Sequence, residues 1–344
     1  MSHSVPSQEY IESLAKSIRE RQELDFKKLC ELLFAIIDYF CAQLPVQTGP
    51  GRRKTYSDNT ILKLDMLMHL TGKRGETEII REVNRHYRPY FDELPDQSRL
   101  WHRIRQGLPL IEQFRQYLRF QLGVEAEDLR ILDTLPIPVA APTSRPGRGN
   151  GFQRAEGGYC ASKKLKYYGF KLGLLITDLG IPDLFELFSA RPHDVQLLDE
   201  LLAQVNRVIA LGDKGFISDP KRLRLAQDQE IFLITYRRAN QKLKNTPLEK
   251  WVLRQDRQLI EPVFSQLDGH MHLQNSGAKT DLGLVKRVMG IITPYTLGIF
   301  LNFLLGRPLL AIKELFAYLR IIGLNYLSKN RRKTEWMTQN QPRQ

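Results

Sequence analysis

The sequence of 344 residues predicts an α/β protein in which an all-α N-terminal domain precedes a sheet flanked by helices. Residues 1–125 carry apolar residues at helical spacing and no strong strand signal. From Glu127 onward, short apolar runs with β-branched residues alternate with helical stretches. Two of these runs hold or lead into an aspartate, Asp133 and Asp213. A carboxylate in a buried strand needs a partner or a metal ion, so these two residues mark a candidate site.

The composition is that of a globular protein with an unusual charge. A hydrophobic content of 42% over 344 residues is enough for large cores in two domains. The net charge of +13 favours a polyanionic partner, most often nucleic acid, although solubility alone is the alternative explanation. Cys30, Cys41 and Cys160 are odd in number and share no metal-site spacing, which favours a reducing compartment. The first residues contain no apolar signal core, so we expect a cytoplasmic protein.

The N-terminal 125 residues predict a series of helices. Apolar residues recur at helical spacing over Gln8–Gln43. Gly, Pro and basic residues over 47–53 predict a linker, and residues 57–60 offer caps for a helix from Ile61.

Two further helices are expected before residue 120. One runs from Thr77 to Tyr87, and the next begins at residues 95–98. The second of these carries Trp101 and three arginines, namely Arg99, Arg103 and Arg105. Short helices joined by tight turns, the last of them basic, suit docking into a DNA groove. A packing or dimerisation module is equally compatible with this pattern.

The first predicted strand, Leu129–Val139, is followed by a basic segment. Residues 145–171 contain Glu156 against seven basic residues, namely Arg145, Arg148, Arg154, Lys163, Lys164, Lys166 and Lys171. Phosphate contacts need such a Lys/Arg surface, and we expect this segment to lie beside Asp133 as a flexible loop. A solvated surface loop is the alternative.

A β-hairpin and a helix are expected next. The strands Tyr168–Thr177 and Leu184–Phe188 are joined through a turn at 179–183. A helix then begins near Asp194, which we predict to be its N-cap. The preceding His193 is more often a structural hydrogen-bonding residue than a catalyst.

The second aspartate follows a short buried strand that starts at Val208. Gly212 and Gly215 allow the backbone to turn sharply and to leave the Asp213 carboxylate at the end of the strand. Carboxyl ends of strands in open α/β sheets are where ligands and metals bind. An ordinary strand-to-helix turn capped by Asp213 is the alternative. A further strand is expected over Glu230–Tyr236.

A helix from about Leu248 carries further polar residues on one face, which are Arg254, Arg257, Glu261, Ser265 and Asp268. Pro262 lacks a backbone donor, so we expect either a new helix near Ile260 or a kink that presents Glu261. The alternative is a solvated face on which an Arg257–Glu261 pair contributes only about 0.2–0.5 kcal/mol.

The stretch from Val288 to Gly306 carries no charge and is long enough to be a membrane candidate. It contains Pro294 and Asn302, and no second span accompanies it. We predict a buried helix pair behind the sheet and no membrane partner.

Five blocks of this sequence resemble a transposase family. Leu-Asp-Thr-Leu-Pro around Asp133, Gly-Asp-Lys-Gly-Phe around Asp213 and Arg-Gln-Leu-Ile-Glu-Pro-Val-Phe-Ser-Gln-Leu around Glu261 are similar to the acidic triad blocks of bacterial insertion-sequence transposases. The likeness is to the family named after insertion sequence 982. Tyr-Tyr-Gly-Phe-Lys at 167–171 and Arg-Pro-His-Asp at 191–194 resemble its intervening blocks. The match spans about 131–302, and residues 55–120 resemble its N-terminal part more loosely.

The resemblance implies a fold and a function. It implies an RNase H-like mixed sheet over residues 126–306, after a helical domain over 1–125 for DNA-end binding or dimerisation and before a basic helical extension over 307–344. It further implies a DDE transposase that cleaves DNA at the terminal inverted repeats of its element and joins the ends to target DNA. Asp133, Asp213 and Glu261 would be catalytic and would ligate two Mg²⁺ ions, which Mn²⁺ could replace. A homodimer on DNA, associated with the bacterial nucleoid, is expected.

One departure limits what can be transferred from the family. Related transposases often carry Tyr, two residues, Arg, three residues, Glu, six residues and Lys. Here Arg257 and Glu261 match, whereas Arg254 stands at the Tyr position and Asp268 at the Lys position. The residues expected to contact DNA are Arg257, Arg254, Lys163, Lys164, Lys166, Lys171, Lys214, Arg148 and Arg154.

The chemistry is consistent with these residues. Two Mg²⁺ ions about 4 Å apart need hard oxygen ligands held on separate elements, and cleave phosphodiesters by activating the nucleophile and stabilising the leaving oxygen. Two alternatives remain: a metal-dependent nuclease of the same fold that does not join strands, and a non-catalytic DNA-binding protein derived from a transposase. The presence of all three acidic residues argues against the second alternative.

Overall fold

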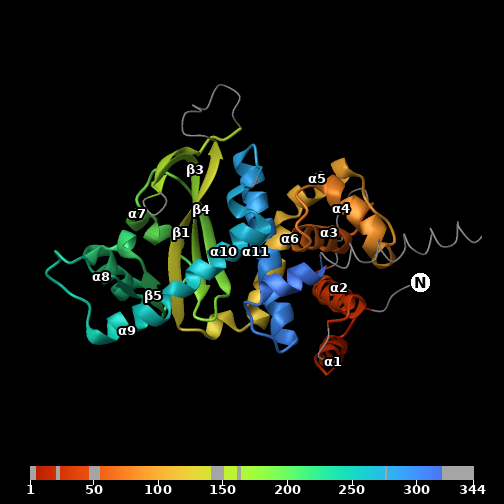
Figure 1. The fold of residues 1–344 in the computed structure, drawn as a ribbon, viewed down its shortest axis with the longest axis horizontal. Helices are drawn as coiled ribbons and strands as arrows, with labels where there is room; N and C mark the ends of the chain where they lie inside the picture. Colours follow the sequence, from red (N-terminus) through yellow and green to blue (C-terminus); the bar gives the residue numbers. More distant parts are fainter. Residues whose placement is uncertain are drawn as a thin grey trace, which may run out of the picture. The chain divides into compact units, whose positions relative to one another are not determined.

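The structure is a computed structural model that describes residues 5–20, 24–45, 55–140, 151–160, 164–275 and 277–319. It divides into two compact units, which are drawn in one view in Figure 1. The first unit comprises residues 1–114 and 297–344, and the second comprises residues 115–296. One boundary falls within helix α6 (Leu108–Gln121) and the other within helix α11 (Asp281–Leu304). The predicted linker at 47–53 lies outside the described residues.

The first unit is helical, as predicted. Its helices before α6 are α1 (Gln8–Arg19), α2 (Phe26–Ala42), α3 (Asp58–Leu70), α4 (Glu76–Glu82) and α5 (Gln97–Gln106), with a π-helical turn over Val83–Tyr87 and a 3₁₀ turn over Arg88–Tyr90. The start of four of these helices is fixed by a side chain that accepts a hydrogen bond from a backbone N–H of the first turn. These caps are Ser7, Asp25, Ser57 and Asp96. Each such cap stabilises its helix by about 1 kcal/mol.

Helix α2 is the core of this unit. Leu29, Leu33 and Ile36 are fully buried on one face of it, and Cys30, Phe34 and Ala35 are buried outside that face, so its buried residues are not confined to one side. A helix that is apolar nearly all round is a central helix, because every face needs apolar neighbours.

Residues 297–319 belong to the same unit by direct contacts. The hydroxyl of Tyr87 donates a hydrogen bond of 3.2 Å to the carbonyl of Leu319. A Cβ placed on Gly298 would lie 3.2 Å from both Ile312 and Phe316, so this glycine permits close packing against the segment that follows α11.

The second unit is built on a mixed six-stranded sheet. Its strands are β1 (Leu129–Ala140), β2 (Glu156–Cys160), β3 (Leu165–Thr177), β4 (Pro182–Ser189), β5 (Ile209–Gly212) and β6 (Phe232–Thr235). The order is β2-β3-β1-β5-β6, and β4 pairs with the part of β3 that β2 leaves uncovered. The strands β1 to β4 pair antiparallel, whereas β5 pairs parallel with both β1 and β6.

Helices flank this sheet. They are α7 (Asp194–Leu201), α8 (Asp219–Asp228), α9 (Pro247–Gln255) and α10 (Ile260–Met271), with 3₁₀ turns over Val124–Ala126, Lys214–Phe216, Arg257–Leu259 and Leu273–Asn275. Buried residues of α7 and α8, among them Leu198 and Leu225, form one apolar cluster with Leu132, Ala210 and Leu233 of the strands. Helix α10 contacts β1 (Figure 1). The expected α/β fold with an all-α N-terminal part is therefore confirmed.

Several local expectations can be compared with the structure. The predicted hairpin is β3–β4, and a new helix does begin at Ile260. The N-cap of α7 is His193 and not Asp194, which occupies the first helical position. The reason is that the backbone N–H of His193 donates to the side chain of Gln196 at 3.0 Å, while the Asp194 carboxylate bonds to other elements. Strand β2 was not predicted, because its Glu-Gly-Gly-Tyr-Cys sequence has a weak strand pattern.

The uncharged stretch over 288–306 is mostly one long helix and not a helix pair. Helix α11 runs through Pro294 without ending, although proline removes one backbone donor. The helix is long and apolar enough to cross a membrane, but 78% of its apolar window is buried within the protein. The predicted burial of this stretch is therefore confirmed, and the apolar composition is explained by packing.

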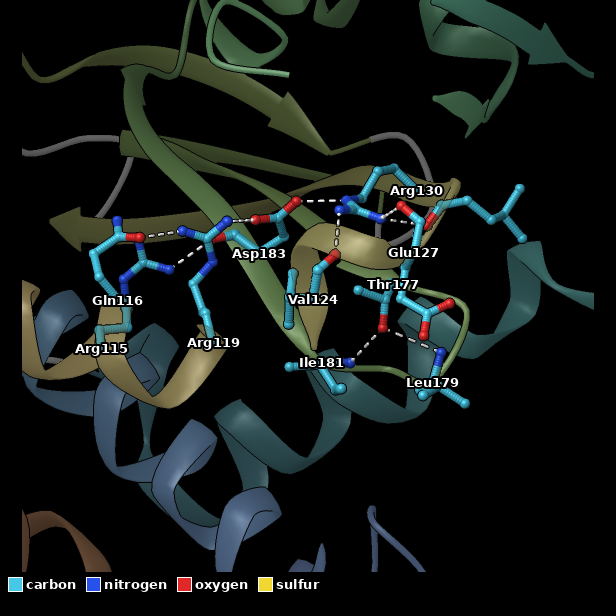
Figure 2. A network of polar contacts seen from close by, with 11 residues as sticks. Arg115, Gln116, Arg119, Val124, Glu127, Arg130, Thr177, Leu179, Ile181 and Asp183 are labelled. Carbon is cyan, nitrogen blue, oxygen red and sulfur yellow. Dashed lines mark hydrogen bonds and ion pairs between the residues drawn. The ribbon is translucent and has the colours of Figure 1, made fainter. Parts of the chain in front are cut away.

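A buried ionic network anchors the start of β1 (Figure 2). Asp183, at the start of β4, is 1% exposed and accepts hydrogen bonds from Arg119 of α6 and, at 2.5 Å, from Arg130 of β1. Arg115 donates to the backbone carbonyl of Asp183, and Arg130 also donates to the carbonyl of Val124 at 2.8 Å. These contacts join the second half of α6 to β1 and β4. In β1 they involve Arg130, which lies three residues before Asp133.

Candidate active site

The two aspartates are neighbours because β1 and β5 pair in parallel. Ile131 lies opposite Leu211 in the register of these strands. Asp133 and Asp213 each follow two residues later, so continuing the register brings them side by side. Asp133 lies within the long strand β1, and Asp213 is the N-cap of the 3₁₀ turn after β5. The prediction that Asp213 projects at the carboxyl end of its strand agrees with this placement.

Glycines allow the tight turn around Asp213. A Cβ on Gly212 would lie 3.3 Å from the side chain of Phe216, which is fully buried beneath the turn. A Cβ on Gly215 would lie only 2.8 Å from Oδ2 of Asp194. A side chain at position 215 would therefore displace either the turn or this carboxylate.

Glu261 comes from a helix start. Helix α9 ends at Gln255, a 3₁₀ turn follows over Arg257–Leu259, and Glu261 is the second residue of α10. Pro262 fits here because the first turn of a helix has no intrahelical partner for its backbone N–H. The side chain of Glu261 is 66% exposed, so this carboxylate has more freedom than the two aspartates.

One guanidinium joins all three carboxylates. Nη2 of Arg257 lies 3.6 Å from Oδ2 of Asp133 and 3.5 Å from Oδ2 of Asp213. Nη1 of the same side chain lies 3.7 Å from Oε1 of Glu261. The guanidinium also lies 6.0 Å from the centre of the Tyr236 ring. The structure thus gathers around one side chain four residues that the sequence places up to 128 positions apart, from Asp133 to Glu261.

The pKa of Asp133 is raised to about 6. Burial is the main cause, because it disfavours the charged carboxylate, and the nearby carboxylates of Asp213 and Asp194 act in the same direction. The backbone N–H of Thr134, which donates to Oδ1 of Asp133 at 2.7 Å, and the charge of Arg257 lower the pKa. The net shift shows that Arg257 does not fully compensate the buried charge of Asp133.

A fourth carboxylate lies beside the site. Oδ1 of Asp194 accepts a hydrogen bond of 3.2 Å from the hydroxyl of Thr134 and one of 3.0 Å from the ammonium group of Lys171. Lys171 also donates to the carbonyl of Pro192 at 2.8 Å. Sequence reasoning missed this role of Asp194 because it treated the residue as a helix cap; the only signal was its place in the Arg-Pro-His-Asp block.

The other predicted DNA-contacting residues lie at different distances from this centre. Lys214 directly follows Asp213 and is exposed, and Arg254 is exposed on α9. Lys164 and Lys166 are exposed where β3 begins, and exposed Arg154 donates to the carbonyl of Leu187 at 3.1 Å. Lys171 is held against Asp194 and Pro192 with a side chain that is 13% exposed. Arg148 and Lys163 lie outside the described residues.

The donor set suits a hard divalent cation, but its present arrangement does not form a ligand cluster. Three carboxylates provide the oxygen ligands that Mg²⁺ prefers. Within the described part of the chain, no group of three or more His, Cys, Asp or Glu side chains is placed to hold a metal ion. The guanidinium of Arg257 stands between the carboxylates, at 3.5 to 3.7 Å from each. The three carboxylates therefore have the chemistry that Mg²⁺ requires. In this arrangement the guanidinium of Arg257 occupies the position between them that a cation would take.

Fold and site together define a class of protein. A mixed sheet with the order β4-β3-β1-β5-β6, two aspartates on the adjacent strands β1 and β5, and a glutamate on a later helix are the features of an RNase H-like domain. Residues 126–297, half of the chain, match the family described as "Transposase DDE domain". The chain belongs to this family. Membership implies a transposase function, divalent metal ions and DNA binding. No curated protein and no solved structure matches the chain.

Proposed function

We propose that this protein cleaves DNA at the ends of an insertion sequence and joins those ends to target DNA, as transposases of the family named after insertion sequence 982 do. The observation that carries the proposal is the convergence of Asp133, Asp213 and Glu261 on one guanidinium. Three carboxylates from two strands and a helix would not share one cation without a common task, because their mutual repulsion destabilises the fold.

We assign metal binding to the three carboxylates. Asp133 and Asp213 have short side chains on adjacent backbone segments and serve as rigid ligands, while the exposed Glu261 can adjust to complete the site. Two Mg²⁺ ions, or Mn²⁺ in their place, supply activation of the attacking water or 3′-hydroxyl and stabilisation of the leaving oxygen. Asp194 accepts a hydrogen bond from Thr134, the neighbour of Asp133, and Lys171 holds Asp194 in place. In this proposal Lys171 is therefore a positioning residue.

We assign DNA contacts to the exposed basic residues. Lys214 and Arg254 lie next to the triad in sequence, and Lys164, Lys166 and Arg154 lie at β2 and β3. Lysine and arginine bind phosphate oxygens without reading sequence, so these contacts would hold the DNA in register. We assign end binding or dimerisation to the helical first unit, and we expect a homodimer to act on the DNA in the bacterial nucleoid.

A strand-transfer assay tests the proposed function. The substrate is DNA that carries the inverted repeats flanking the gene, together with a target plasmid and Mg²⁺. We expect cleaved ends and joined products from the wild-type protein, and neither product above background from Asp133→Asn, Asp213→Asn or Glu261→Gln. End binding, measured by gel shift, should persist in these variants, because the substitutions preserve shape and remove only ligand charge.

The matched control is Asp228→Asn, which removes an exposed carboxylate at the end of α8 and should retain both activities. Cleavage without joining would show a nuclease of the same fold. Binding without cleavage by the wild-type protein would show a DNA-binding derivative of a transposase.

A further inference from the structure

The contacts of Arg257 differ from those of an ordinary structural arginine. Its three carboxylate partners lie at 3.5, 3.6 and 3.7 Å. These separations are those of ion pairs and exceed the roughly 2.7–2.9 Å of charge-assisted hydrogen bonds. An arginine that serves to lock carboxylates normally forms short, parallel hydrogen bonds with one of them. The pairing is therefore loose, and the carboxylates keep oxygens free to accept another cation.

The charges of this cluster also favour replacement of the guanidinium by a divalent cation. Three carboxylates face one guanidinium, which leaves two negative charges uncompensated when all four groups are ionised. Lys171 does not supply the missing charge, because its ammonium group bonds to Asp194 and to the carbonyl of Pro192. A divalent cation supplies the missing charge and brings carboxylate oxygens closer than a guanidinium allows, since Mg²⁺ binds oxygen at about 2.0–2.1 Å.

Two features of Arg257 favour withdrawal of its side chain from the three carboxylates. Its Nε is buried and has no hydrogen-bond partner among the described residues. The residue lies in the 3₁₀ turn between α9 and α10, and its side chain can change rotamer without breaking a backbone hydrogen bond. It is followed three residues later by the start of α10, so withdrawal of its side chain would leave Glu261 in place.

From these observations we propose that Arg257 is a positioning residue that holds the three carboxylates together in the metal-free protein and yields them to incoming divalent cations. The guanidinium prevents mutual repulsion from spreading the carboxylates before the metal arrives. Metal binding then releases the guanidinium, which can bind a phosphate of the DNA. The inference rests on the proposed function, because it takes the three carboxylates as the metal ligands.

The direct test is the affinity of the DNA-free protein for Mn²⁺, measured by electron paramagnetic resonance of the unbound ion. If Arg257 competes with the metal, Arg257→Gln should bind Mn²⁺ about tenfold more tightly than the wild type, within the range usual for coupled ligands. Arg257→Lys keeps a competing charge and should stay closer to the wild type. The matched control is Arg254→Gln, which removes the same charge from the exposed face of α9 and should change the affinity by less than about twofold.

The outcomes separate this inference from the function on which it rests. If Asp133→Asn leaves Mn²⁺ binding intact, the carboxylates are not the metal site and the proposed function fails. If Asp133→Asn removes binding while Arg257→Gln binds Mn²⁺ no more tightly than the wild type, only the inference about Arg257 is overturned.

A second measurement covers the case in which Arg257→Gln does not fold. In the wild-type protein, the ¹⁵Nε resonance of Arg257 should shift and exchange faster with water when Mg²⁺ is added, because the guanidinium moves into solvent. The resonance of Arg254 serves as the internal reference. An unchanged Arg257 resonance at saturating Mg²⁺ would overturn the proposal.

Discussion

At the scale of single residues, burial makes Asp133 costly to the fold. The side chain is 23% exposed, and burial is the largest cause of its raised pKa. A carboxylate with a raised pKa binds its proton more tightly in the folded state than in the unfolded chain. Its ionisation therefore lowers stability as the pH rises from about 4, its value in the unfolded chain, to about 6. The protein retains this residue at the expense of stability, which is common at functional sites.

A pH-dependent gain in stability follows for Asp133→Asn. In the absence of metal at pH 7, the free energy of unfolding of the variant should exceed that of the wild type by about 1–3 kcal/mol, because a shift of one pKa unit corresponds to about 1.4 kcal/mol. The difference from the wild type should shrink as the pH falls from about 6 to about 4, where the wild-type carboxyl takes up its proton. Urea unfolding at a series of pH values, followed by circular dichroism, measures this difference.

Asp228→Asn is again the control, since its exposed carboxylate should give no such pH-dependent gain. If Asp133→Asn is less stable than the wild type at pH 7, the contacts to Arg257 and Thr134 outweigh burial, and the raised pKa is wrong.

At the scale of elements, strand β1 organises the second unit. It pairs with β3 on one side and β5 on the other, it carries Asp133, and its start is held by Arg130 in the Asp183 network (Figure 2). The network satisfies both oxygens of a nearly inaccessible carboxylate with two arginines. A buried ion pair adds little net stability compared with apolar packing, but removing one partner leaves buried charge uncompensated.

Asp183→Asn should therefore destabilise the second unit by about 3–5 kcal/mol, because Arg119 and Arg130 would remain buried without their carboxylate. Hydrogen exchange of the β1 and β4 amides measures the loss locally, which avoids treating two units as one transition. The matched change is Asp228→Asn at the exposed end of α8, which should leave exchange in β1 nearly unchanged. Equal exchange rates in both variants would show that the network contributes no stability to β1.

At the scale of the whole molecule, the positive charge is the property that favours DNA binding. The net charge of +13 belongs to the whole sequence, and the exposed Lys164 and Lys166 contribute to it at the start of β3. DNA binding through such residues releases counterions from the phosphate backbone and therefore weakens with salt.

Replacing Lys163, Lys164 and Lys166 with Ala should weaken DNA binding and flatten its dependence on salt. The slope of log K against log salt should fall by about 0.9 for each DNA phosphate that the variant no longer neutralises. Fluorescence anisotropy with labelled end DNA between 50 and 200 mM salt, roughly the range where the effect is large, measures the slope. Replacing Lys242, Lys244 and Lys250 with Ala removes the same charge elsewhere on the second unit; an equal change in slope in both triple variants would assign the effect to net charge.

The sequence by itself determined the fold class and some of the helix starts, and it singled out the three acidic residues. These features are local: caps such as Ser57, the short apolar runs of the strands, the glycines around Asp213 and the proline after Glu261 act within a few residues and can be read from the chain. The family match over residues 126–297 agrees with the expected fold.

Only the tertiary structure decided which groups meet. The parallel register of β1 and β5 places Asp133 beside Asp213, and no local pattern specifies that register. The same holds for Arg257, which was expected to contact DNA, or alternatively to pair with Glu261, and which also pairs with both aspartates. It holds too for Asp194, whose carboxylate reaches Thr134 and Lys171 instead of capping its helix. Electrostatic partners are set by distance in space, which depends on how strands pair and helices pack. This is why the sequence singled out the three carboxylates but not the guanidinium that joins them.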